Sequence, residues 1–156
     1  MAFDPEKRIQ ELHVMLPEPA KPVAKYKTAV KLGNTLYVSG HGPAADTPKE
    51  LRAGRVGADL SPDQGYKAAR EVGRNILGTV KAVLGSLNKV KRLVKTLGMV
   101  NCTADFKDQP KVINGFSELM AEVFGEDAGV GARSAVGMGS LPGNIPVEIE
   151  CILEVE

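Results

Sequence analysis

The sequence predicts an α+β domain built from one sheet and two long helices. Two stretches, 61–86 and 108–125, repeat apolar residues at helical spacing. Strand-like patterns occupy 26–39, 93–102, 132–138 and 146–155. The chain has 156 residues, a formal net charge of +1 and 43% hydrophobic residues, which is typical of one compact domain. We therefore predict a single domain over 1–156, in which 1–25 form an N-terminal helix and a proline-rich connector.

The N-terminal helix is predicted from its cap. Asp4 is a favourable N-cap residue, and Pro5 follows at the first helical position. Pro17 ends the pattern, and 17–25 then carry three prolines, which favours an extended connector. The apolar stripe of this helix is expected to comprise Ile9, Leu12 and Met15.

A hairpin and a long loop are predicted next. Gly33-Asn34 separates two strand-like runs within 26–39 and is a typical two-residue hairpin turn. The following stretch, 40–58, holds four glycines and two prolines without a sustained period. It is expected to be a long loop with one short strand.

The first long helix starts at Ser61, where Ser61-Pro62-Asp63-Gln64 forms a capping box. In the stretch 93–102, both sets of alternating positions carry apolar residues. A strand with two apolar faces is typically covered on both sides. Asp108-Gln109-Pro110 opens the second long helix, which is expected to end at Gly125.

Two helices can cover only one face of the sheet. The strand at 93–102 is apolar on both faces, so the second face must be covered by something else, and another copy of the chain is the simplest candidate. The sequence therefore predicts a homo-oligomer.

Several functional classes are disfavoured. A net charge near zero gives no overall field for nucleic acid or anionic lipid, and no apolar run is long enough to span a bilayer. No export signal is visible, so we expect a cytoplasmic protein whose two cysteines, Cys102 and Cys151, stay reduced. His13 and His41 lie far apart without metal-binding motifs, and no nucleotide loop or nucleophile elbow occurs. We expect neither a metal nor an organic cofactor.

The stretch 131–151 reads GARSAVGMGSLPGNIPVEIEC and contains Arg133-Ser, Leu-Pro and Glu148-Ile-Glu. It resembles the C-terminal signature of the Rid family of reactive-intermediate deaminases, also called YjgF-like or endoribonuclease L-PSP proteins. The resemblance extends over nearly all of the chain past residue 25, through Leu32-Gly33-Asn34, Ser39-Gly40, Val94-Lys95-Thr96 and Val112-Ile113-Asn114.

The resemblance implies a chorismate-mutase-like mixed sheet with both long helices on one face, assembled as a homotrimer with sites in the clefts between subunits. It also implies hydrolysis of enamine or imine acids of the 2-aminoacrylate type to a 2-keto acid and ammonia, without a cofactor. Arg133 and Glu148 are expected to carry the chemistry. By position, further groups are expected near the substrate, namely Tyr26, Ser39, Gly40, His41, Asn114 and Ala135.

These residue types suit that reaction. The forked guanidinium of Arg133 can hold a substrate carboxylate through two parallel hydrogen bonds. A carboxylate such as Glu148 can position a water and move its proton, which is typically worth about a hundred- to ten-thousand-fold in rate. The alternative for Arg133 is an ordinary ion pair with Glu148 or Glu150, and the alternative for each glutamate is a solvated strand face.

The chain also departs from the family pattern. Ala135 stands where family members often carry Cys, His41 replaces the usual Gln, and the loop 40–58 is longer. His41 could shuttle a proton, although a hydrogen-bonded loop histidine is the simpler interpretation. These departures resemble a longer branch of the family.

Two other functions stay open. One is a module that binds small carboxylates such as 2-keto acids without turnover. The other is an endoribonuclease or translation inhibitor, suggested by the basic run Lys89–Lys95. The nucleic-acid interpretation is disfavoured because the chain has only 4% aromatic residues and no Trp for base stacking.

Overall fold

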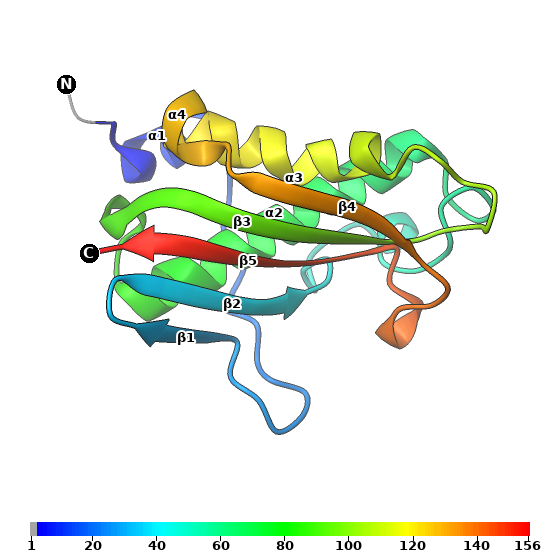
Figure 1. The fold of residues 1–156 in the computed structure, drawn as a ribbon, viewed down its shortest axis with the longest axis horizontal. Helices are drawn as coiled ribbons and strands as arrows, with labels where there is room; N and C mark the ends of the chain where they lie inside the picture. Colours follow the sequence, from blue (N-terminus) through cyan, green and yellow to red (C-terminus); the bar gives the residue numbers. More distant parts are fainter. Residues whose placement is uncertain (1–2) are drawn as a thin grey trace.

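The computed structural model describes residues 3–156, which form a five-stranded mixed sheet with its helices packed on one face (Figure 1). The order of the strands across the sheet is β1-β2-β5-β3-β4. The strands are β1 Ala29–Leu32, β2 Thr35–His41, β3 Val90–Asn101, β4 Ala132–Met138 and β5 Val147–Val155. The α-helices are α1 Pro5–Glu11, α2 Pro62–Leu84, α3 Gln109–Phe124 and α4 Glu126–Gly129, and three short 3₁₀ turns are η1 Lys49–Leu51, η2 Leu87–Lys89 and η3 Pro142–Asn144. The predicted α+β class is confirmed, while residues 1 and 2 of the predicted domain lie outside the described residues.

The pairing of the strands explains why the sheet is mixed. β3 and β4 run parallel, with α3 in the crossover between them, whereas β1–β2, β2–β5 and β3–β5 are antiparallel. A parallel pair needs such a crossover, because a tight turn can join only antiparallel strands. The predicted hairpin is present, with its turn at Gly33, whose φ of +59° suits glycine.

The two long helices begin where their caps predict. The Ser61 side chain accepts from the Gln64 backbone N–H, and the Gln64 side chain accepts in return from the Ser61 N–H, so the capping box is confirmed. α3 differs, since the side chain of Asp108 makes no cap bond and pairs instead with Lys111 at 3.3 Å.

The core lies between the helices and one face of the sheet. Phe116, Leu119 and Ile76 from the helices are fully buried there, together with the inward residues of β5, which alternate with glutamates. At Gly115 a Cβ atom would overlap the Tyr66 carbonyl of α2, so this glycine lets α2 and α3 approach closely. Burial of this apolar face is the main stabilising term for such a layered fold.

The N-terminal helix is shorter than predicted. α1 ends at Glu11, and His13 adopts a positive φ of 54°, which turns the chain away from the helical path. Met15 is consequently 80% exposed, whereas Leu12, Val14 and Leu16 pack against the core. The predicted stripe containing Met15 is therefore wrong, because the turn at Leu12–His13 ends the helical spacing before Met15.

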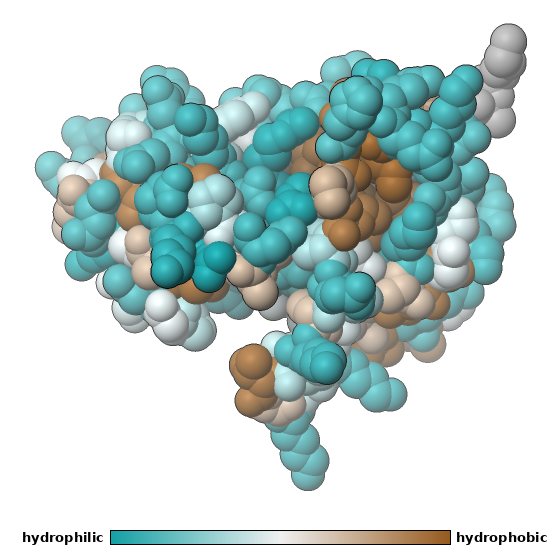
Figure 2. Space-filling view, turned by 180° about the vertical axis from the view of Figure 1, so that it is seen from behind, coloured by the Kyte–Doolittle hydropathy of each residue, from teal (hydrophilic) through white to brown (hydrophobic). Residues whose placement is uncertain are grey.

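The segment 18–28 projects from the body of the molecule, below the sheet in Figure 1 and as a separate lobe in Figure 2. Residues 21–27 are all exposed. The proline-rich connector was predicted over 17–25, where its prolines disfavour strand pairing. The strand predicted from Tyr26 begins only at Ala29. The helix side in Figure 2 is mostly hydrophilic, with an apolar hollow near the N-terminus.

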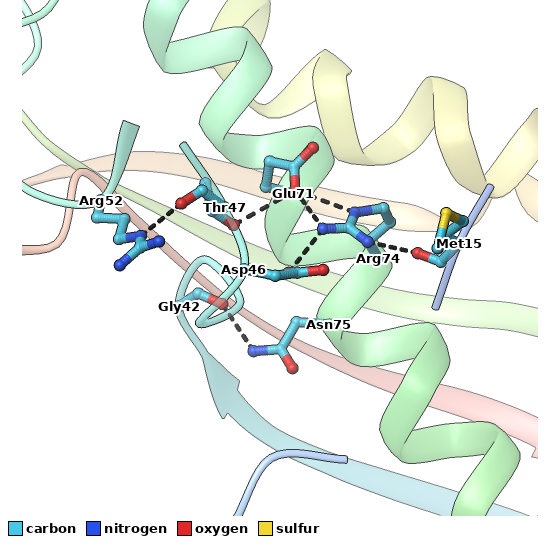
Figure 3. A network of polar contacts seen from close by, with 8 residues as sticks. All are labelled: Met15, Gly42, Asp46, Thr47, Arg52, Glu71, Arg74 and Asn75. Carbon is cyan, nitrogen blue, oxygen red and sulfur yellow. Dashed lines mark hydrogen bonds and ion pairs between the residues drawn. The ribbon is translucent and has the colours of Figure 1, made fainter. Parts of the chain in front are cut away.

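The loop after β2 is held to α2 by a polar network (Figure 3). The Arg74 guanidinium pairs with both Asp46 and Glu71 at 2.8 Å and also donates to the Met15 carbonyl. The next residue of α2, Asn75, donates through its side-chain amide to the Gly42 carbonyl at 3.0 Å. These contacts fix the end of β2, where several predicted site residues lie.

The predicted short strand within 40–58 is reduced to isolated bridges of Val56 with Leu60 and Cys102. Among residues 3–156, no helix combines the length and the apolar character needed to cross a bilayer.

Candidate functional site

Arg133 lies on β4, the strand at the edge of the sheet, and its side chain points toward α3. In the register of the sheet it stands beside Thr96 of β3, which in turn stands beside Cys151 of β5. Neighbours across a sheet point to the same face, and both Thr96 and Cys151 are buried under the helices. Arg133 therefore belongs to the helix-covered face.

The guanidinium of Arg133 is held by α3. Its Nη1 donates to Asn114 Oδ1 at 2.8 Å and to Ser117 Oγ at 3.2 Å. Its Nη2 makes only a long contact of 3.5 Å with the Pro110 carbonyl, and Nε has no hydrogen-bond partner among residues 3–156. Both hydrogens of Nη1 are thus used, while the Nε–Nη2 edge, the edge that can grip a carboxylate bidentately, stays available.

A groove of about 250 Å³ surrounds this arginine. The groove combines apolar walls with the polar groups of α3, and its lining includes Leu93, Thr96, Asn114, Ser117, Val130 and Arg133. Such a site has one permanent cation and a small apolar space beside it, which suits a small organic acid.

Glu148 lies on the open face of the sheet. It stands beside Met99 of β3, three positions from Thr96, so its side chain points away from the helices. Burial raises the pKa of the Glu148 carboxyl above its ordinary value of 4.5, and the neighbouring charge of Glu150 raises it further. The Glu148 carboxylate lies directly over Gly40, where any Cβ atom would overlap its Oε1.

Ser39 lies on the same face of the sheet as Glu148. The Ser39 hydroxyl donates to the Lys27 carbonyl at 2.6 Å and lines a cavity of about 390 Å³ on the open face. That cavity also includes Tyr37, Lys95 and Ile152. Tyr26 is 43% exposed on the projecting segment 18–28.

His41 does not reach either site. It is only 4% exposed and points under the sheet, with Nδ1 2.6 Å from the Ser39 carbonyl and Nε2 2.9 Å from Thr79 Oγ1 of α2. A carbonyl can only accept, so Nδ1 donates and the neutral ring accepts at Nε2 from the Thr79 hydroxyl. Burial lowers the pKa of His41, against the opposing effect of the bond to the Ser39 carbonyl. In this chain His41 is a core residue that joins β2 to α2.

The structure thus divides six of the eight predicted residues into two groups and leaves His41 and Tyr26 outside both. Arg133 and Asn114 meet in the groove beside α3, and Ala135 follows on the same face of β4, where it packs against the core. Gly40 and Glu148 meet on the open face, where Ser39 also lies.

Ser117 was missed by the sequence interpretation. It is three residues after Asn114 on α3, so both side chains lie on one helix face. That spacing was a usable signal, because a second polar side chain one turn from a predicted site residue interrupts an otherwise apolar stripe.

Two of the four cations in the basic run Lys89–Lys95 pair with acids of the same chain. Lys91 pairs with Glu156 at 2.9 Å, and Arg92 pairs with Asp127 at 3.2 Å. Paired cations offer a weaker field to a phosphate backbone. Within residues 3–156, no group of three or more His, Cys, Asp or Glu side chains could hold a metal ion.

Comparison with known proteins gives consistent matches along the chain. Residues 6–152 match the model of the YjgF/chorismate mutase-like endoribonuclease family. Protein TCP17 of Trypanosoma cruzi is 38% identical over 94% of this chain and 91% of its own length. The 2-iminobutanoate/2-iminopropanoate deaminase of Dermatophagoides farinae is 28% identical over 92% of this chain and 95% of its own. The crystal structure of Atu1372 from Agrobacterium tumefaciens, a protein of unknown function, superposes with a TM-score of 0.87 at 41% identity, covering 97% of this chain and 92% of that one.

Proposed function

Since the chain belongs to the YjgF/chorismate mutase-like family, which includes imine deaminases, we propose that it hydrolyses small enamine or imine acids of the 2-aminoacrylate type. The products are a 2-keto acid and ammonia. The observation that carries the proposal is the available Nε–Nη2 edge of the Arg133 guanidinium. Asn114 and Ser117 already hold this guanidinium in place through Nη1. That edge matches the geometry of a substrate carboxylate.

The reaction needs little more than orientation and one proton carrier. An enamine acid first tautomerises to the imine. With the carboxylate on Arg133, a water attacks the imine carbon; Glu148 takes one proton of the water and passes it to nitrogen, which gives a carbinolamine. Glu148 then carries the remaining hydroxyl proton to the nitrogen, the C=O double bond forms, the C–N bond breaks and ammonia leaves. A carboxyl whose pKa is raised by burial is a better base for this task than a fully solvated one.

We further propose that two copies of the chain form each site and that the assembly is a homotrimer. Arg133 and Glu148 lie on opposite faces of one sheet, so a single copy cannot bring both to one small molecule. The open face also exposes apolar side chains, including Val30, Tyr37 and Val136, which a second copy would bury. We place this activity in the cytoplasm, where the two buried thiols stay reduced.

The test is the hydrolysis of 2-iminopropanoate, generated in the assay and followed by its disappearance. The unmutated protein is expected to accelerate the reaction. Arg133→Ala is expected to abolish the acceleration, and Glu148→Gln to reduce it by about a hundredfold or more. Glu150→Gln is the matched control, because it makes the same chemical change on the same face and is expected to keep the activity. No acceleration by the unmutated protein would contradict the proposal and favour binding of 2-keto acids without turnover.

The two-copy arrangement has its own test. Arg133→Ala and Glu148→Gln chains, each inactive alone, are unfolded together and refolded as mixed oligomers. Sites that combine the intact Arg133 of one copy with the intact Glu148 of another regain activity, and random mixing predicts about one quarter of the unmutated level. Complete lack of recovery in mixed oligomers of normal size would contradict the shared site.

A further inference from the structure

A second arginine, Arg55, lies at the far end of the parallel strands and is rigidly placed. Its backbone N–H donates to Asp59 Oδ2 at 2.8 Å, and the adjacent Val56 bonds to the end of β3 on both sides, through Asn101 and Thr103. The turn 54–60 is thus joined to the strand end by several backbone bonds. A side chain on such a turn is preorganised for binding.

The guanidinium of Arg55 has few partners. Its Nη2 donates to the Cys102 carbonyl, while its Nε is buried and makes no hydrogen bond with any of residues 3–156. No carboxylate in that part of the chain lies within 4.0 Å of it, in contrast to Arg74 and Arg92. The buried Nε–H cannot itself contact a ligand, but Nη1 also has no hydrogen-bond partner among residues 3–156, so the positive charge of Arg55 is left uncompensated. A negatively charged ligand at Nη1 would compensate it.

A cavity of about 400 Å³ opens in front of Arg55. Its lining combines this cation with the polar Thr103 and Gln109, the small Gly137 and Gly139, and the aromatic ring of Phe106. Gly139 has no atom within 4 Å of the position that a Cβ would occupy, so the cavity is open at this point. The carboxyl ends of parallel strands, here β3 and β4, are a common place for ligands.

We infer that this cavity binds a small oxyanion, either phosphate or a carboxylate, at the guanidinium of Arg55. The nearby acids do not fill that role. Asp59 accepts from the Arg55 backbone, Asp108 pairs with Lys111 at 3.3 Å, and Asp105 is exposed. The site is separate from the groove of Arg133, which lies four positions back along β4 from Gly137.

The test is an NMR titration of the uniformly ¹⁵N-labelled protein with inorganic phosphate and, separately, with acetate. Either anion is expected to shift the Arg55 side-chain Nε–H and the backbone amides of Thr103, Gly137 and Gly139. Phosphate alone, acetate alone or both will identify the oxyanion. Arg55→Gln is expected to weaken the binding at least tenfold, whereas Arg52→Gln, the same change at an arginine outside the cavity, is expected to leave it unchanged.

Two further variants separate this inference from the proposed function and from misfolding. Arg133→Met removes the first cation and is expected to leave the shifts around Arg55 intact. Gly139→Asp adds a carboxylate in the open part of the cavity without displacing packed atoms, and it is expected to weaken binding even where Arg55→Gln fails to fold. Shifts that survive in Arg55→Gln, that vanish in Arg133→Met, or that are missing with both anions would overturn the inference.

Discussion

Arg133 and Glu148 project from opposite faces of the same sheet. The register fixes this relationship, because Arg133 stands beside Thr96 of β3 and Glu148 stands beside Met99. Side chains alternate between the two faces along a strand, so residues three positions apart, such as Thr96 and Met99, point to opposite faces. The proposed carboxylate-holding group and the proposed proton carrier of one chain are thus separated by the thickness of the sheet. The catalytic proposal and the oligomer therefore depend on each other.

The first prediction concerns pH. Burial and the charge of Glu150 both raise the pKa of Glu148, which favours its protonated form. The mechanism needs the carboxylate, so kcat/KM is expected to fall as pH drops through a midpoint above 4.5. Glu150→Gln removes one of the two causes, and it is expected to move this midpoint to lower pH without lowering the plateau. The pH–rate profile of both proteins measures the shift, and an unmoved midpoint would show that another group titrates.

The second prediction concerns the residues that hold Arg133. Ser117→Ala and Asn114→Ala each remove one acceptor from Nη1 of Arg133. The guanidinium can then rotate, and its Nε–Nη2 edge is less often in the orientation that binds a carboxylate. Hydrogen bonds to charged groups are typically worth about 1.5–3 kcal/mol, so each change is expected to raise the Kd for a 2-keto acid by roughly ten- to a hundredfold. Calorimetric titration with pyruvate measures this effect.

Ser140→Ala, an exposed serine outside the groove, is the control for the same chemical change. If Ser117→Ala binds pyruvate as tightly as Ser140→Ala does, the proposed positioning role is refuted.

The third prediction separates the two interpretations of His41. His41→Phe keeps a ring in the core but removes the bonds to Thr79 and to the Ser39 carbonyl, which is expected to cost about 1–3 kcal/mol of unfolding free energy. Because burial lowers the pKa of His41, the unfolded chain takes up a proton more readily than the folded one. His41 thus makes the protein less stable as pH falls below 6.5, and the variant is expected to lose that part of the pH dependence. Denaturant unfolding at several pH values tests both points, and the per-site rate of the folded variant is expected to stay unchanged.

The sequence was sufficient for the elements whose ends carry chemical signals. The Ser61–Gln64 box, the Gly33-Asn34 turn and Gly125 after α3 each fix a boundary through local hydrogen bonding or a positive φ. The end of α1 had no comparable signal, because residues other than glycine rarely adopt the positive φ that His13 has. Such an end is decided by packing against α3 and the core, which the local pattern does not contain.

The site was less accessible to sequence reasoning because a bulge changes which residues share a face. In β2, Val38 pairs with Cys151 and His41 with Ile149, so Ser39 and Gly40 together stand opposite Glu150 alone. Simple alternation would place His41 beside Ser39 on the open face, whereas the extra residue turns it into the core. The direction of Arg133 likewise depends on the parallel pairing with β3, which only the folded sheet defines.

The last prediction concerns the open face. Val30 and Val83 are similarly exposed, at 49% and 46%, but Val30 lies on the open face of the sheet and Val83 on the outer surface of α2. If a second copy covers the open face, Val30→Asp buries a charge in that interface and is expected to shift the protein from trimer to monomer in sedimentation velocity. Val83→Asp is expected to leave the trimer intact, which controls for the added charge. If each site needs two copies, as proposed, the monomeric Val30→Asp protein is also expected to lose hydrolysis of 2-iminopropanoate while its circular dichroism stays native. An active monomer would contradict the shared site, and an unchanged trimer would place the interface elsewhere.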